Sequence, residues 1–151
     1  PDLTLTIAGR GWEPFEAAAQ RALGVLGARF VRPGLLPPEK AAELEIGADI
    51  LLSLGNAFDN QMPSKLFSYL GTGKPLLHLA VTDTDPTLPY LAKYPLALVL
   101  HKKNGVTPEV VDTLRRWLTD VQGQCLPYAQ VAAFYPEFTP GVVAQTFIGR
   151  I

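Results

Sequence analysis

The order of apolar and polar stretches along the chain predicts that strands alternate with helices. Short runs rich in Leu, Ile, Val and Thr, each closed by a turn residue, indicate strands. The run from Ala48 to Leu54 is nearly continuous in apolar residues, which is typical of a strand covered on both faces in a parallel sheet. The predicted strands lie near residues 3–8, 29–32, 49–54, 75–80 and 96–100.

Helical spacing and terminal residues predict the elements between and after these strands. Apolar residues recur every three or four positions after Glu13, and Gly27 follows the end of that pattern. Thr107 suits a helix N-cap and Pro108 the first helical position. The predicted helices cover residues 13–25, 37–47, 63–71, 88–93, 107–121, 128–135 and 139–148. This alternation predicts an α/β fold with a doubly wound parallel sheet, whose ligands bind at the carboxyl ends of the strands.

Size and charge define the class of protein further. The chain has 151 residues, of which 48% are hydrophobic and 18% charged, so it can bury one core, and we expect a single domain over residues 1–151. Thirteen Lys and Arg against fourteen Asp and Glu give a net charge of -1, which argues against a nucleic-acid partner.

The remaining composition offers little covalent or metal chemistry. Cys125 is the single cysteine, so no internal disulfide forms, and His78 and His101 lie too far apart in sequence to suggest a metal site with it. No apolar run approaches the roughly 20 residues that span a bilayer. The chain starts at Pro1 without a basic leader, so we expect a soluble, cytoplasmic piece excised from a longer protein.

Two glycine-containing stretches fail as nucleotide-binding motifs. Gly9 and Gly11 follow a predicted strand, but the dinucleotide fingerprint needs a third glycine where this chain has Pro14. Gly73 and Lys74 would need a following Ser or Thr to form a phosphate loop, and Pro75 stands there instead.

The segment from Pro63 to Pro75 is the strongest candidate for a binding site. A strand, a polar loop and a helix whose first turn holds Ser64 and Lys65 form an anion site, because amides and the helix dipole favour negative charge. A phosphate or diphosphate is the expected ligand. The alternative is a surface helix that only packs its apolar side chains, Leu66, Phe67 and Leu70, into the core.

Two stretches resemble a known family. Ala-Asp-Ile-Leu-Leu-Ser-Leu-Gly-Asn (48–56) and Pro-Ser-Lys-Leu-Phe-Ser-Tyr-Leu-Gly-Thr-Gly-Lys-Pro (63–75) resemble the donor-binding half of GT-B-type glycosyltransferases, close to the family 4 group. Residues 3–9, 31–37 and 138–151 are similar to that domain's second strand, third strand and closing helix. The resemblance therefore extends along the chain, and its specific part is residues 63–75.

The resemblance implies roles for particular residues. The amides of Ser64, Lys65 and Leu66 would hold the diphosphate of a sugar nucleotide, and Val31 and Arg32 would lie beside the base. Family members commonly carry a pair of carboxylates, one of which binds the ribose. This chain has Asn60 and Ser68 at those two positions.

The resemblance also implies an activity and a partner domain. The chain would bind the donor of a glycosyltransferase, with no metal or other cofactor required and with the acceptor and the catalytic residues unidentified. The acceptor domain would precede this chain, so the isolated chain is expected to transfer no sugar. The family domain's first strand and helix are missing, which predicts a gap in mid-sheet. A noncatalytic GT-B-like scaffold and a sugar-nucleotide epimerase-like enzyme are the alternatives.

Overall fold

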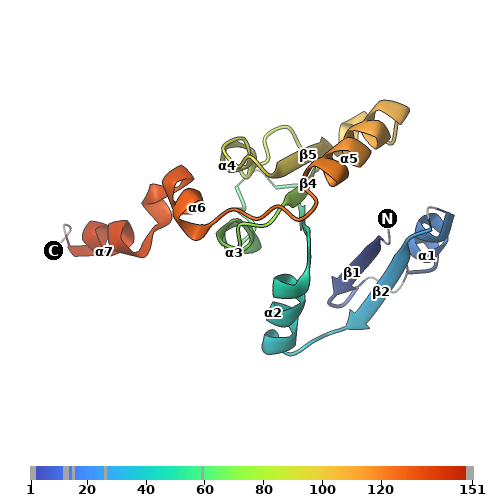
Figure 1. Ribbon diagram of the computed structural model, residues 1–151, viewed down its shortest axis with the longest axis horizontal. Helices are drawn as coiled ribbons and strands as arrows, with labels where there is room; N and C mark the ends of the chain where they lie inside the picture. The colour runs from blue at the N-terminus through green and yellow to red at the C-terminus, as the bar shows by residue number, and fades with distance from the viewer. Residues whose placement is uncertain (1–2, 12–13, 15, 26, 59, 149–151) are drawn as a thin grey trace. The chain divides into compact units, whose positions relative to one another are not determined.

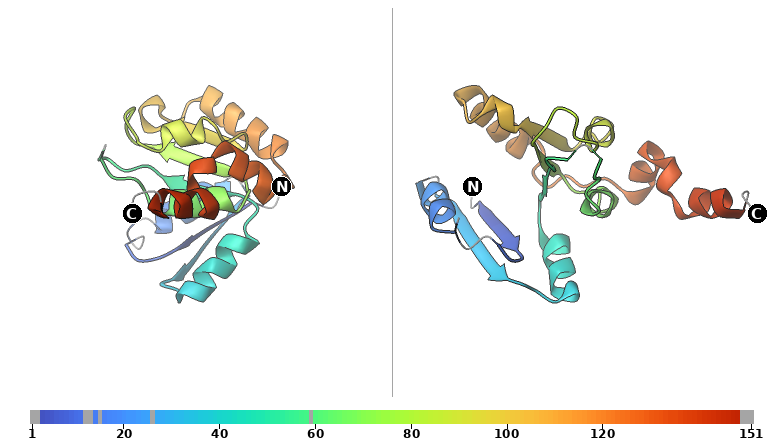
Figure 2. Two further views of the ribbon diagram at one scale, coloured as in Figure 1. Left: turned by 90° about the vertical axis from the view of Figure 1, so that its left-hand side faces the viewer. Right: turned by 180° about the vertical axis from the view of Figure 1, so that it is seen from behind.

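The computed structural model describes residues 3–148 except 12, 13, 15, 26 and 59. The chain divides into two compact units, Pro1–Gly47 and Ala48–Ile151. Their elements follow one another along the chain in Figure 1, and two further views are given in Figure 2. Each unit has its own parallel sheet, so each is described by itself.

The first unit alternates two strands with two helices. Its elements are β1 (Thr4–Ala8), α1 (Glu16–Val25), β2 (Arg29–Gly34) and α2 (Pro38–Gly47). β1 and β2 pair in parallel, with Thr4 opposite Arg29, and the register shifts between Thr6 and Ala8. The two parallel strands and the helix between them thus form one βαβ unit.

The second unit holds a three-stranded sheet and most of the helices. Its elements are β3 (Leu51–Leu54), α3 (Lys65–Gly71), β4 (Leu76–Ala80), α4 (Leu88–Leu91), β5 (Ala97–His101), η2 (Lys102–Asn104), α5 (Pro108–Asp120), α6 (Tyr128–Phe134), η3 (Pro136–Phe138) and α7 (Pro140–Ile148). The strands pair in parallel in the order β3-β4-β5. In Figure 1, α5 lies beside β5 and α7 lies beyond α6.

The core of the second unit lies between its sheet and the helices that cover it. Leu66 and Leu70 of α3 are buried against Leu51 of β3 and Leu76 of β4. Leu91, Tyr94, Leu96, Val121, Val131 and Tyr135 complete the cluster of buried side chains. α3 is thereby held on the sheet through one of its sides.

The α/β class, the parallel strands and the position of every predicted strand are confirmed. The described strands make a two-stranded and a three-stranded sheet, so no unbroken five-stranded sheet is present among them. The doubly wound arrangement of the strands stays a prediction. The predicted helices are also found. The predicted start of the first, near Glu13, falls at residues outside the described part of the chain.

Two helix starts show how local chemistry sets element bounds. The Thr107 side chain accepts a hydrogen bond from the Val110 amide at 3.3 Å, as expected for an N-cap. α3 begins at Lys65 instead of Pro63, because the first turn closes through a hydrogen bond from the Leu66 amide to the Pro63 carbonyl at 3.1 Å. In the described residues, no helix combines the length and apolarity that crossing a bilayer requires.

Candidate functional site

The predicted binding segment connects β3 to β4 and starts where β3 ends. The Gly55 amide donates to the Leu79 carbonyl at 2.9 Å, so the segment leaves the sheet at the carboxyl ends of these two parallel strands. The loop that follows is closed by a hydrogen bond from Asn56 Nδ2 to the Gln61 carbonyl at 3.1 Å. The loop then enters α3. The segment is therefore at the edge of the sheet where ligands bind in parallel α/β folds.

α3 presents two kinds of surface. Leu66 and Leu70 are buried, whereas Ser64, Lys65 and Ser68 are exposed. Ser68 follows Ser64 by four residues, which places both on one side of the helix. The helix therefore packs into the core, as the alternative interpretation requires, and also presents the polar residues that the binding interpretation requires.

One backbone amide of the first turn of α3 already donates a hydrogen bond within the protein. Of the three amides predicted to hold a diphosphate, that of Leu66 already donates to the Pro63 carbonyl. Ser64 itself has helical dihedrals, φ -60° and ψ -29°. The ammonium of Lys65 lies 5.8 Å from the centroid of the Tyr69 ring, a cation–π distance. A ligand at this turn would share the Leu66 amide and draw Lys65 away from Tyr69.

The seven predicted site residues fall in both units. Asn60, Ser64, Lys65, Leu66 and Ser68 belong to the second unit, within the segment between β3 and β4. Val31 and Arg32 belong to β2 of the first unit. Val31 is exposed, and Arg32 Nε pairs with Glu16 Oε2 of α1 at 2.8 Å. The five residues of the second unit lie in one continuous segment between β3 and β4, whereas Val31 and Arg32 lie on β2 of the first unit.

The glycine and lysine that end the segment have structural roles. Gly73 has a φ of 74°, and a Cβ there would collide with the Leu126 carbonyl. The Leu126 amide donates back to the Gly73 carbonyl at 2.8 Å, which fixes this approach. Lys74 Nζ donates to the carbonyl of Ala48, just before β3. The Gly-Lys pair therefore anchors the end of α3 and is unrelated to a phosphate loop.

A buried polar cluster lies beside the start of the segment, and it was not predicted. Ser53 of β3 and His78 of β4 face one another in register, with Ser53 Oγ 3.1 Å from His78 Nδ1. His78 Nε2 lies 3.0 Å from Asp85 Oδ2 and 3.2 Å from Thr87 Oγ1. All four side chains are buried. The sequence holds one signal of this cluster, since Leu-Leu-Ser-Leu and Leu-Leu-His-Leu place a polar residue at the same strand position.

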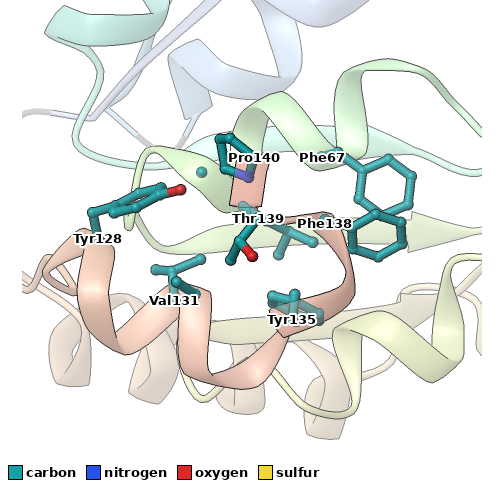
Figure 3. A pocket seen from close by; sticks show the side chains of 10 residues that line it. Phe67, Tyr128, Val131, Tyr135, Phe138, Thr139 and Pro140 are labelled. Atoms are coloured by element: carbon teal, nitrogen blue, oxygen red, sulfur yellow. The ribbon is translucent and has the colours of Figure 1, made fainter. Parts of the chain in front are cut away.

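An apolar cavity of about 250 Å³ lies elsewhere on the second unit, next to α6. Figure 3 shows its walls, which include Phe67 of α3, Tyr128 and Val131 of α6, and Tyr135, Phe138 and Pro140. The Phe67 and Phe138 rings are 4.5 Å apart between centroids. Burial and the charge of Glu137 raise the pKa of Tyr135 to about 12, so its hydroxyl stays a donor, to the Tyr90 carbonyl at 2.7 Å. None of the predicted site residues lines this cavity.

Within residues 3–148, apart from the five undescribed positions, no three His, Cys, Asp or Glu side chains are grouped so that they could hold a metal ion. Cys125 is exposed, and its thiol lies 3.6 Å from the Thr72 carbonyl. The described residues thus provide amides, hydroxyls, carboxamides and a lysine at the carboxyl edge, which are groups suited to an anion or a polyol.

Comparisons with protein-family models, with curated proteins and with solved structures find no match to this chain.

Proposed function

We propose that this chain is the donor-binding part of a cytoplasmic GT-B-type glycosyltransferase that moves a sugar from a nucleotide diphosphate sugar to an acceptor. The observation that carries the proposal is the placement of residues 63–75, which bear the specific resemblance. They follow the carboxyl end of a parallel strand, and Ser64, Lys65 and Ser68 are exposed there. Ligands of parallel α/β folds bind at this edge.

The proposed role of α3 is electrostatic. As the bond between sugar and diphosphate breaks, negative charge grows on the leaving diphosphate. The amides of Ser64 and Lys65 and the ammonium of Lys65 would offset that charge without a metal ion. The Ser68 hydroxyl, one turn further along, would face the ribose, with the Asn60 carboxamide in the preceding loop.

The doubly wound GT-B arrangement belongs to the same proposal. Two all-parallel sheets with helices between their strands are compatible with it. The order β3-β4-β5 supports the proposal for the second unit.

A noncatalytic GT-B-like scaffold is the second candidate. Asn60 and Ser68 favour the scaffold, because both are exposed and neither supplies the carboxylate that binds the ribose in the family. A scaffold would keep the packing of Leu66 and Leu70 and would have no need of the polar side of α3.

Titration of the 151-residue chain with uridine diphosphate and guanosine diphosphate separates the two candidates. A donor-binding domain binds at least one of them in isothermal titration calorimetry, and more tightly than the corresponding nucleoside. Inorganic phosphate serves as the control for unspecific attraction of anions. If the folded chain binds neither diphosphate, the donor-binding proposal fails and the scaffold remains.

A further inference from the structure

The buried cluster of Ser53, His78, Asp85 and Thr87 joins four elements at the carboxyl edge of the second unit's sheet. Ser53 comes from β3, His78 from β4, Asp85 from the loop after β4, and Thr87 from the start of α4. The side chains of His78 and Asp85 are fully buried. A buried carboxylate needs hydrogen bonds that replace its lost hydration, so each bond in this cluster has a structural consequence.

The carboxylate of Asp85 is satisfied at both oxygens. Oδ1 accepts from the Thr87 amide at 2.9 Å and from the Thr87 hydroxyl at 2.7 Å. Oδ2 lies 3.0 Å from His78 Nε2. Burial opposes ionisation, but the hydrogen bonds from Thr87 and His78 outweigh it and hold the pKa of Asp85 below its ordinary value. Because the ionised carboxylate can only accept, His78 Nε2 is the donor in this contact.

Asp85 also lies against the backbone at the start of the binding segment. A Cβ on residue 55 would collide with Asp85 Oδ2, and it would lie 3.1 Å from the Leu79 carbonyl oxygen. Glycine is therefore required at position 55 by the carboxylate, since its own backbone dihedrals are ordinary. Gly55 opens the loop that leads through Asn56 and Asn60 to α3. The carboxylate thus packs closely against the backbone at the point where that loop leaves β3.

We propose that Asp85 and His78 are positioning residues for the diphosphate site: through Gly55 they hold the loop that carries Asn60 and Ser64 in its ligand-binding arrangement. This inference rests on the proposed function. His78 orients the carboxylate through Nε2, and Ser53 orients His78 through Nδ1. The hydrogen bonds from Thr87 connect the carboxylate to the start of α4. None of the four touches the ligand. They act on it only through the loop.

Asp85→Ala tests the inference in the full chain. The variant should bind uridine or guanosine diphosphate about 3- to 30-fold more weakly, the range for residues that act through others. The measurement is made at a temperature where circular dichroism shows the same fold. Electrostatics alone predicts the opposite sign, because loss of a negative charge near the site should tighten binding of an anion. Asp85→Asn keeps the shape beside Gly55 and should restore affinity to within about twofold of the wild type.

Asp83→Ala is the matched control. Asp83 lies two residues away in the same loop, is exposed, and bonds to Lys103 at 2.6 Å. Its removal should not weaken diphosphate binding. If Asp83→Ala and Asp85→Ala weaken binding equally, the loop acts as a whole and the role of the buried cluster is overturned.

A second readout separates this inference from the proposed function. Amide exchange of Asn56, Asn60 and Lys65 should quicken in Asp85→Ala while the amides of β4 and β5 remain as protected as in the wild type. If exchange quickens in this way but neither diphosphate binds to the wild type, the cluster holds the loop and the proposed function fails. Unchanged exchange at these three amides, in a folded variant, overturns the inference. Should Asp85→Ala not fold, Ser53→Ala is read in the same way, with a smaller change of the same sign expected.

Discussion

We propose that the Lys65 ammonium is the cation that faces a bound diphosphate. It is exposed at the first turn of α3, near the Tyr69 ring, and its ammonium can reach a ligand without unfolding any part of the core. Leu66, the next residue, is fully buried and fixes the turn on the sheet. The exposed cation of Lys65 and the buried side chain of Leu66 therefore belong to neighbouring residues.

Lys65→Ala should weaken binding of a nucleoside diphosphate more than that of the nucleoside. The expected loss is about 1 to 3 kcal/mol, the range for a charge-assisted hydrogen bond to phosphate. Calorimetric titration with both ligands measures the difference. Lys93→Ala is the control, because Lys93 is an exposed lysine that precedes β5 at the opposite, amino end of the sheet. Equal weakening of nucleoside and diphosphate would place Lys65 near the base or in the fold alone.

Ser68→Glu should tighten nucleoside diphosphate binding by about 1 to 2 kcal/mol. A carboxylate there can accept hydrogen bonds from both ribose hydroxyls. Repulsion between this carboxylate and the phosphates reduces the gain in binding free energy somewhat. Ser68 is exposed, so the longer side chain needs no space in the core. The uncharged variant Ser68→Gln controls for size, and a dideoxynucleoside diphosphate should show no gain. Unchanged or weaker binding by a folded Ser68→Glu protein would show that the ribose does not lie over this helix.

Asp85 gives the protein a definable response to acid. Its pKa is lower in the folded state than the ordinary value of 3.8, so its contribution to stability is complete above that value and is lost as pH falls through the folded pKa. Asp85→Asn should reduce the free energy of unfolding by about 1.5 to 3 kcal/mol at pH 7, the range for hydrogen bonds to a charged group. Urea unfolding at pH 7 and below pH 4 measures it. A difference between wild type and variant that stays constant on acidification contradicts this assignment.

At the scale of elements, α5 shows how a short sequence signal sets a helix start. Thr107 has extended dihedrals, φ -101° and ψ 161°, and caps the helix that begins at Pro108. Thr107→Ala should lower the free energy of unfolding by about 0.5 to 2 kcal/mol through loss of this cap. Thermal unfolding monitored by circular dichroism checks the value. Thr119, inside the same helix, offers the control Thr119→Ala, which should not destabilise to the same extent; equal losses would show that the cap contributes nothing of its own.

The strands and helices could be predicted because apolar runs and turn residues are local signals. The run from Ala48 to Leu54 indicates β3 without knowledge of its neighbours. The pairing of strands depends on contacts between residues that are far apart in sequence. Ser53 and His78 are 25 residues apart, and only the register of β3 against β4 brings them together. The requirement for glycine at position 55 arises from Asp85, which is remote in sequence. Tertiary contacts of this kind leave no local pattern.

At the scale of the whole molecule, the predicted site residues are divided between two compact units. The first unit carries Val31 and Arg32, which the family resemblance assigns to the base, on a strand that α1 contacts through the pair of Arg32 with Glu16. The second unit carries the segment that we propose for the diphosphate and ribose, beside the buried cluster of Asp85 and His78.

Nuclear magnetic resonance of the ¹⁵N-labelled chain, titrated with uridine diphosphate and guanosine diphosphate, tests the central claim most directly. We predict saturable shifts that are largest at the amides of Asn60, Ser64, Lys65 and Ser68. The nucleoside alone should leave the α3 amides nearly unmoved. Shifts confined to the aromatic cavity around Tyr135, or no saturable shift with either diphosphate, would contradict the claim that α3 forms a diphosphate site.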